Sequence, residues 1–444
     1  MKRYSEYKES GAEWLPEIPD KWETSHVKRV CQNVTDGAHT SPDLSSPDKP
    51  FVTVVNIKNG KIDLKDCLYT SQRDYDQLVR NGCKPQNGDV LYSKDGTIAE
   101  TIVVNETASF VVGSSLIILK SNRLVIPQYL KLILASYSLK NEAFKVLRGA
   151  GLPRISIGNV AKLQILKPPP EDQKSIANYL EKETGKIDQK IAGLEKKTLL
   201  YKELKQSIIN ETVTRGLPAK EAQAEGLTPN PSLKNSGIPW IGEIPEHWEV
   251  ISISAVTDPV SIKNHPNKEL LSVYRDYGVI IKSSRDDNHN RAGNLENYKL
   301  VKKGWLAMNK MKTWQGSLGV SDYEGIVSPA YIICRVDHKK VTPQYLHFLL
   351  RSKRYIGQYN RLSYGVRIDQ WDMRYNDFKY LSITIPSEIE QKEISKFIKS
   401  KHAHIDKITA TITEQITTLK ELRKTLINDV VTGKICVTDD KLTK

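Results

Sequence analysis

The chain of 444 residues lacks the features that mark membrane, secreted and disulfide-rich proteins. No apolar run approaches the roughly 18 residues that a membrane span requires. The first residues, MKRYSEYKESGAEW, are polar and contain no apolar stretch typical of a secretory signal. The five cysteines are far apart and form no CxxC pair, which argues against a disulfide framework or a zinc site. We therefore expect a soluble cytoplasmic protein with buried or inert thiols and no metal site.

The sequence also lacks the motifs of three enzyme classes. It contains no GxxxxGK[ST] phosphate loop, so ATP-driven translocation is not expected in this chain. An adenine methyltransferase would show an Asn/Asp-Pro-Pro-aromatic motif, but the proline cluster Pro168–Glu171 has neither the preceding polar residue nor the following aromatic residue. Asp43 and Asp48 lie near Lys49, and we interpret them as turn residues rather than as nuclease carboxylates. No catalytic residue is predicted.

The chain does carry an excess of positive charge. Lysine and arginine outnumber the acids by 66 to 52, which gives a formal net charge of +14. Such an excess attracts polyanions, because bound phosphates release their counterions. A merely solvated basic surface would give the same composition. With 39% hydrophobic residues, the chain is also long enough for two or more domains of ordinary size.

Long segments of the chain occur twice. The opening motif SGAEWLPEIPDKWE returns as SGIPWIGEIPEHWE, and Trp14 and Trp22 recur as Trp240 and Trp248. The segment ELKQSIINETVT returns as ELRKTLINDVVT 218 residues later, and IPQYLKLILAS returns as TPQYLHFLLRS 216 residues later. Each half therefore has an opening motif, a variable region and a shared tail, and the variable regions have diverged. A flexible linker rich in Pro, Gly, Ala and Asn is predicted around residues 216–233.

The two tails have the periodicity of long helices. Each follows a proline stop, at Pro168–Pro170 and at Pro386, and roughly 40 helical residues would span about 60 Å. Their apolar residues recur mostly at intervals of three, four and seven, and Leu204 and Leu422 belong to this pattern. The predicted seam consists of Leu180, Ile187, Ile191, Leu194, Tyr201 and Ile208 in the first tail, and of Ile398, Ile405, Ile412, Leu419 and Leu426 in the second.

An isolated amphipathic helix of this length would leave its apolar stripe in water, so each tail needs a partner. We favour pairing of the two tails within one chain, as an antiparallel coiled coil with approximate twofold symmetry. Two alternatives stay open at this stage: each tail folds back on its own domain, or the tails pair between two chains of a dimer.

The variable regions have the composition of mixed α+β domains. The segments 50–64, 106–120 and 303–320 are rich in β-branched residues and interrupted by Gly and Asn, which predicts short strands and turns. A helix is expected around 127–137 and another around 343–351. The predicted order of the chain is a first α+β domain at 1–170, a long helix at 171–216, a linker and second α+β domain at 217–388, and a second long helix and tail at 389–444.

The side chains best suited to contact DNA lie in the variable regions. Amides and basic groups hydrogen-bond to base edges or phosphates, and aromatic rings stack. For each candidate the alternative is a structural role, because a tryptophan often lies in a core and a lysine often faces solvent. The candidates are Tyr92, Ser93, Lys94, Thr97 and Arg154 in the first half, and Asn309, Lys310, Lys312, Trp314, Gln315 and Arg367 in the second.

Taken together, these segments resemble the specificity subunits of type I restriction-modification systems over essentially the whole chain. The resemblance lies in WLPEIPDKWE and WIGEIPEHWE, in the tail from IANYLEKETGKIDQKIAGLEKK to ETVTRGL, and in LLSVYRDYGVI followed by NKMKTWQGSLGVSDYEGIVSPAY. It implies two target recognition domains that each read one half of a split double-stranded DNA site. It also implies antiparallel helices that set the gap between the half-sites and bind two modification subunits.

The resemblance assigns the chemistry to partners. S-adenosylmethionine, ATP and Mg²⁺ would be bound by the modification and motor-nuclease subunits, and none by this chain. The first variable region, with DGAHTSPD at 36–43, is of a different subgroup from the second, so base contacts cannot be transferred between the halves. Three other functions stay open: a self-contained nuclease or methyltransferase, a basic coiled-coil scaffold, and the specificity protein of a combined cutting and methylating type II system.

Overall fold

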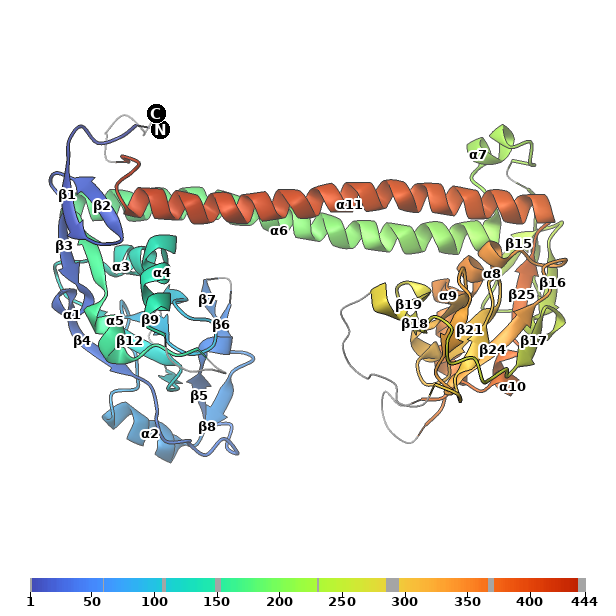
Figure 1. Ribbon diagram of the computed structural model, residues 1–444, viewed down its shortest axis with the longest axis horizontal. Coiled ribbons are helices and arrows are strands. Elements are labelled where there is room, and N and C mark those ends of the chain that lie inside the picture. The colour runs from blue at the N-terminus through green and yellow to red at the C-terminus, as the bar shows by residue number, and fades with distance from the viewer. Residues whose placement is uncertain are drawn as a thin grey trace. The chain divides into compact units, whose positions relative to one another are not determined.

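The computed structural model describes residues 2–58, 60–105, 109–147, 153–229, 231–284, 295–365 and 371–437. The chain forms two compact units, shown in Figure 1. The first unit comprises residues 1–195 and 414–444, and the second comprises residues 196–413. Within the described ranges, no helix has the length and apolar character needed to cross a membrane.

The first unit is an α+β domain, as predicted. Its four-stranded sheet has the order β10-β9-β12-β4, and a three-stranded sheet has the order β11-β5-β8. The strands are β1 (Tyr7–Ala12), β2 (Leu15–Pro19), β3 (Glu23–His26), β4 (Cys31–Asp36), β5 (Lys49–Val52), β6 (Ile57–Lys58), β7 (Lys61–Ile62), β8 (Leu68–Thr70), β9 (Val90–Ser93), β10 (Thr101–Val103), β11 (Val111–Val112), β12 (Leu116–Ser121) and β13 (Gln164–Lys167). The helices are α1 (Val27–Val30), α2 (Gln72–Arg80), α3 (Pro127–Ala135), α4 (Tyr137–Lys145) and α5 (Ile157–Lys162).

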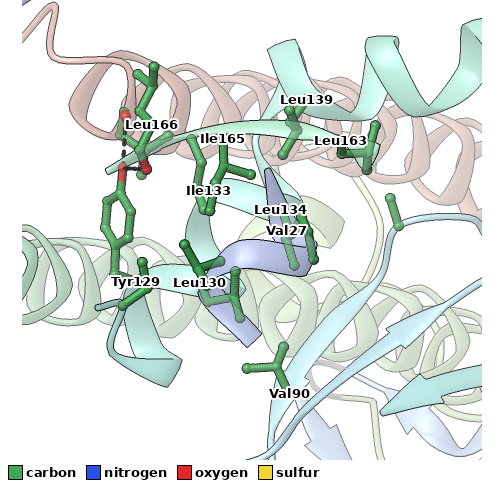
Figure 2. Close-up of a cluster of buried hydrophobic side chains, with 14 of the residues drawn as sticks. Val27, Val90, Tyr129, Leu130, Ile133, Leu134, Leu139, Leu163, Ile165 and Leu166 are labelled. Atoms are coloured by element: carbon green, nitrogen blue, oxygen red, sulfur yellow. Dashed lines mark hydrogen bonds between the residues drawn. The ribbon is translucent and has the colours of Figure 1, made fainter. Parts of the chain in front are cut away.

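The core of this unit forms around α3, which confirms the helix predicted there. Proline begins α3 because its fixed φ suits the first helical turn, where its missing N–H is not needed. Tyr129, Leu130, Ile133 and Leu134 follow at helical spacing and are all buried. Figure 2 shows these side chains among residues of β9, β13 and α1. The Tyr129 hydroxyl donates a hydrogen bond to the carbonyl of Leu166 on β13.

The second unit repeats this plan. Its four-stranded sheet has the order β22-β21-β24-β17, which matches the order of the first. The Tyr345 hydroxyl donates to the carbonyl of Thr384, as the equivalent tyrosine does in the first unit. Its strands are β14 (Leu233–Asn235), β15 (Glu243–Pro245), β16 (Glu249–Ser252), β17 (Thr257–Val260), β18 (Leu271–Tyr274), β19 (Gly278–Ile281), β20 (Lys299–Val301), β21 (Leu306–Asn309), β22 (Leu318–Val320), β23 (Gly325–Val327), β24 (Tyr331–Val336) and β25 (Ser382–Ile385). Its helices are α7 (Ala219–Ala224), α8 (Pro343–Leu350), α9 (Lys353–Leu362) and α10 (Tyr375–Phe378).

Two long helices, α6 (Pro170–Arg215) and α11 (Glu388–Val431), contribute to both units. In the first unit, the beginning of α6 lies beside the end of α11, and Asp188 Oδ1 accepts from Arg423 Nε at 2.9 Å. In the second unit, the end of α6 lies beside the beginning of α11, and Lys205 Nζ donates to Asp406 Oδ1 at 2.7 Å. The two helices are therefore antiparallel, and the predicted pairing within one chain is confirmed.

The seam between the helices follows a heptad pattern. In α6 the seam rows run through Leu180, Ile187, Leu194, Tyr201 and Ile208, and through the residues four positions after each of these. Across both helices Leu180, Ile191, Ile398, Ile405, Ile412 and Leu426 are buried, whereas Ile187, Leu194, Tyr201, Ile208 and Leu419 are half-buried.

Assigning Leu204 and Leu422 to the apolar stripe was wrong. Their side chains are 45% and 51% exposed. Leu204 shares its row of the helix with Glu183, Lys190 and Lys197, seven residues apart, and this row lies outside the seam. Leu204 lies three residues after the seam residue Tyr201, but the second seam row of α6 lies four residues after the first. A spacing of three therefore did not place Leu204 in the seam.

In each unit a buried glutamine fastens the α+β part to the long helix that follows it in the chain. In the first unit Gln173 accepts from the Ile126 amide at 2.9 Å and donates to the carbonyls of Leu124 and Pro168 at 2.9 and 2.8 Å. In the second unit Gln391 repeats all three bonds, with the Thr342 amide and the carbonyls of Lys340 and Pro386 at 2.7, 3.1 and 3.0 Å. Both side chains are only 1% exposed, so these bonds replace contacts with water.

The opening motifs pack against the ends of the long helices. Gly433 ends α11 with φ +75°, and its Cα lies so close to Trp22 and Pro19 that an added Cβ would lie 2.5 Å from Pro19 Cδ. In the second unit Gly216 ends α6 with φ +82° and lies beside Trp248. Glycine adopts this left-handed conformation at little cost, which explains its place after each helix. The repeated tryptophans thus form part of the joint between the α+β part of each unit and the long helix that begins in the other half of the chain.

The linker around residues 216–233 differs from the prediction of a flexible connection. Its described part contains α7, in which Ala222 is 3% exposed. Glu225 Oε1 accepts from Lys396 Nζ at 3.0 Å, and Glu221 Oε1 lies 3.5 Å from Lys401 Nζ. Alanines and acids at helical spacing let this segment pack on the basic face of α11, so its composition alone did not indicate its structure.

Candidate DNA interface

The candidate residues of the first half lie on β9 and on the loop that follows it. Tyr92 has no exposed surface, and burial raises the pKa of its hydroxyl. Ser93 is also fully buried, and its hydroxyl donates to the carbonyl of Thr97. Placing Tyr92 and Ser93 among the DNA-contacting candidates is therefore corrected, because all four residues of β9 are buried.

Lys94 is likewise buried, in an ion pair with Asp36 at the end of β4. The two side chains are 8% and 10% exposed. The same carboxylate lies 2.9 Å from His39 Nε2, and the His39 side chain is 69% exposed. Lys94 is thus a support beneath the surface rather than a direct contact, since a buried charge is retained only where it is paired. His39, which the sequence analysis did not single out, is the member of this group that reaches solvent.

Thr97 and Arg154 remain at the surface. Thr97 follows Gly96, whose φ of +68° makes the tight turn after β9. Arg154 Nε donates to Asp95 Oδ1 at 2.6 Å, and 61% of the arginine side chain is exposed. The Ile155 amide donates to the carbonyl of Lys94 at 3.0 Å. These bonds bring the segment before α5 to the turn after β9, although some 60 residues separate them.

The same two segments meet in the second unit, with different charges. The Met373 amide donates to the carbonyl of Lys310 at 2.9 Å, and Lys310 Nζ pairs with Asp372 Oδ2 at 2.7 Å. Asp36 pairs with Ile117 across the first sheet, and Val260 pairs with Ile333 in the same place of the second. Because Val260 provides no carboxylate, Lys310 is 42% exposed where Lys94 is buried. The two recognition regions thus share a frame and differ in the side chains on it.

Aromatic and basic side chains gather beside Lys310. Trp314 lies 5.2 Å from Trp371 between ring centroids, and its Nε1 donates to the carbonyl of Met311 at 3.1 Å. The Arg374 guanidinium lies 4.6 Å from the ring of Tyr364, which is 45% exposed. Such partly exposed rings and guanidinium groups can stack on bases or bind phosphate.

The other candidates of the second half lie at or near this cluster. Asn309 Oδ1 accepts from the Met311 amide at 3.2 Å and so shapes the turn. Lys312 is exposed and Gln315 is half-buried, so both side chains reach the surface. Arg367 lies outside the described residues. Trp371 and Tyr364 were not predicted, although the run of aromatic and basic residues in YGVRIDQWDMRY could have indicated them.

The cysteines are placed as the sequence predicted. Four are buried and Cys436 is half-buried. Burial raises the pKa of the Cys31 and Cys334 thiols to about 12, which keeps them protonated at neutral pH. In the part of the chain that the structure describes, no three His, Cys, Asp or Glu side chains converge as metal ligands would.

Comparison with known proteins gives one consistent result. Residues 19–196 match a family model described as the type I restriction modification DNA specificity domain. The chain is 25% identical over 372 residues to the specificity subunit of the type I restriction enzyme MjaVIII of Methanocaldococcus jannaschii, which covers 79% of this chain and 77% of that protein. It is 21% identical over 440 residues to the specificity subunit of the type I restriction enzyme StySPI of Salmonella potsdam, with 94% and 90% covered.

Two further matches differ in how much they cover. The chain spans about half the length (53%) of a specificity subunit ascribed to a type I restriction enzyme MjaX of Methanocaldococcus jannaschii, to which it is 26% identical over 247 residues. A solved chain from a study of the assembly and conformational transition of the type I R-M system shares its fold, with a TM-score of 0.65, 15% identity, and 94% and 99% of the two chains covered. These relatives carry the names of type I enzymes, and the type II alternative is not favoured. Residues 19–196 thus match the type I restriction modification DNA specificity domain, and the chain is similar to type I specificity subunits over most of its length.

Proposed function

We propose that this chain is the DNA-reading subunit of a type I restriction-modification complex and that each recognition region reads one half of a split target. We call residues 19–167 the first reader and residues 245–385 the second reader. The observation that carries the proposal is the shared frame with different surface groups. Asp36 and Lys94 form a buried pair in the first reader, whereas Lys310 and Asp372 form a partly exposed pair in the second.

The difference between the readers implies two different half-sites. A base edge is recognised by the hydrogen-bond donors and acceptors placed against it, so a changed set of side chains reads a changed sequence. The frame that the two readers share would present the side chains of each reader in the same way to its own half-site. Bases between the half-sites would remain unread, and the length of the helices would set their number.

The helices also offer a surface for partner subunits. Leu204 and Leu422 occupy equivalent places, one in each unit, and both are about half exposed. Leu199 and Leu200, which are 64% and 55% exposed, extend the apolar surface on α6, whereas Thr417 and Thr418 stand at the equivalent positions of α11. Exposed apolar side chains that lie together on a surface are typical of contact sites. Because an exposed leucine recurs at the equivalent place on each helix, we propose that these two places bind two copies of one modification subunit and that motor-nuclease subunits join this assembly.

The chemistry would then belong to the partners. We propose that the modification subunits bind S-adenosylmethionine, that the motor-nuclease subunits bind ATP and Mg²⁺, and that this chain itself is not catalytic. We also propose a cytoplasmic location, because the complex would act on the DNA of the cell. Turnover of DNA by the purified chain alone, with S-adenosylmethionine and Mg²⁺, would contradict this division of roles.

Exchange of one reader tests the proposal. The second reader is replaced by that of another member of the family, and the methylated sequences are mapped in cells that also express the modification subunits. We expect one half-site to change, while the other half-site and the gap stay the same. Parent chain and chimera are compared in the same host. A change in both half-sites, or methylation without sequence preference, contradicts the proposal.

A further inference from the structure

The first reader contains a hollow, and none of the DNA-contacting candidates named from the sequence is among the residues that line it. Its volume is about 460 Å³. It lies between the loop after β4, the turn after β9 and the turn before β12. Besides His39, Asp95 and Gly96, the hydroxyl-bearing side chains that line it are Thr40, Ser41, Thr53, Ser114 and Ser115.

The base of this hollow is built from backbone that leaves no room for side chains. The Ala38 amide donates to the Val112 carbonyl at 2.9 Å. A Cβ atom added to Gly37 would lie 2.2 Å from the carbonyl oxygens of Gly113 and Val112. Such a close approach of two segments requires glycine and fixes the position of the loop that begins at Ala38.

Two of the carboxylates beside the hollow are neutralised by cations. Asp36 is paired with buried Lys94, and Asp95, which lines the hollow, is paired with Arg154. A polyanion would therefore meet no net negative charge from these two carboxylates.

Some of the hydroxyl groups are already engaged within the chain. Thr53 Oγ1 donates to Asn56 Oδ1 at 3.1 Å, and Ser115 Oγ accepts from the Val54 amide at 3.0 Å. Among the residues that the structure describes, the hydroxyl groups of Thr40, Ser41 and Ser114 remain available to a ligand.

One edge of the His39 ring is anchored and the other faces solvent. Nε2 lies 2.9 Å from Asp36 Oδ2, and a proton on Nε2 is the arrangement that favours this approach, because a carboxylate only accepts hydrogen bonds. In the neutral imidazole the other nitrogen, Nδ1, is then the acceptor. The carboxylate is itself held by buried Lys94, so the ring is anchored on one side and exposed on the other.

We propose that His39 reads one base of the first half-site by accepting a hydrogen bond at Nδ1 from an exocyclic amino group in the major groove. Adenine and cytosine present such a donor there, whereas guanine and thymine present acceptors or a methyl group. His39 would thus admit adenine or cytosine at one position and exclude guanine and thymine. This inference rests on the proposed function, because it assumes that the first reader contacts a half-site.

The first experiment maps methylated sequences for the full chain expressed with its modification subunits. His39→Ala is expected to relax the first half-site at one position and to leave the second half-site unchanged, which is an internal control. His26→Ala is the matched variant, because His26 lies on β3 of the same unit and does not line the hollow. It is expected to keep the parental sequence.

The second experiment measures binding of the assembled complex to duplexes in which that base lacks its amino group, for example with purine in place of adenine. The parental complex should bind about 5- to 30-fold more weakly, the effect of one lost hydrogen bond, and the His39→Ala complex should lose nothing further. An unchanged methylation sequence for His39→Ala overturns the inference. The inference is also overturned if His39→Ala weakens binding equally on all sequences and reduces its salt dependence, because this result would indicate a phosphate contact. A parental complex with no sequence preference would instead refute the proposed function itself.

Discussion

Replacing Gln173 by alanine should release the first reader from α6 and leave the second reader in place. The Gln173 side chain makes three hydrogen bonds to backbone groups and is 1% exposed. A buried backbone group left without its partner costs about 1–3 kcal/mol, and neighbouring losses are not fully additive. We therefore expect a loss of about 3–5 kcal/mol in the free energy of unfolding of the first unit.

The assay must report on each unit separately, because a chain with two units need not unfold in one step. Hydrogen exchange followed by mass spectrometry meets this need. Gln173→Ala should speed exchange at the Ile126 amide and through α3, whereas exchange at Thr342 should stay at the parental rate. Gln391→Ala should give the reverse pattern, since Gln391 binds the Thr342 amide.

Gln189 provides the control, because it is exposed on the same helix within the first unit. Gln189→Ala should change stability by less than about 0.5 kcal/mol. If Gln173→Ala cost no more than Gln189→Ala, or if it loosened both units equally, the glutamine would not be the fastening that its bonds indicate.

Three further predictions concern the helix ends, the thiols and the partner surface. Gly433→Ala should lower the free energy of unfolding by about 2–4 kcal/mol, because the added methyl group would clash with Pro19 and alanine disfavours the left-handed φ, whereas Gly216→Ala should lower it by about 1 kcal/mol. Thermal unfolding compares the two variants, and equal losses of stability would contradict the clash with Pro19. Cys436 should react first with a thiol reagent at pH 8, and Cys31 and Cys334 should resist until the pH approaches their pKa of about 12 or the chain unfolds; fast labelling of Cys31 in the native chain would refute this. Leu422→Glu and Leu204→Glu should each remove one modification subunit, by mass measurement of the assembly, while exposed Val55→Glu in the first reader should remove none; an assembly that keeps both subunits with both leucines changed would exclude this surface.

The repeats and the helical periodicity of the sequence were sufficient to predict the main helices. The helices beginning at Pro127 and Pro343 and the long helices α6 and α11 are where the patterns indicated. A pattern could not tell which row of α6 faces its partner, because Leu204 and Tyr201 are both apolar and only the seam decides between them. The packing of α7 on α11 was missed for a similar reason, since it depends on acids that meet Lys396 and Lys401 in space.

The candidate interface was predicted less completely. The segments that contain Lys94 and Lys310 do lie at equivalent places, and Arg154 reaches the turn after β9 as an exposed basic group. The burial of Lys94 depends on Asp36, 58 residues away, and no local pattern reveals that contact. His39 was overlooked because an isolated histidine in a loop carries no signal until its carboxylate partner is known.

Shortening both long helices tests the central claim most directly, namely that α6 and α11 set the separation of two unlike half-sites. Residues 192–198 and 413–419 are removed together, so that the pairs Asp188–Arg423 and Lys205–Asp406 are kept. One heptad in each helix removes about 10 Å of helix. Methylation mapping should then show a gap shortened by up to about 3 base pairs, with both half-site sequences unchanged. An unchanged gap, or altered half-sites, would contradict the account.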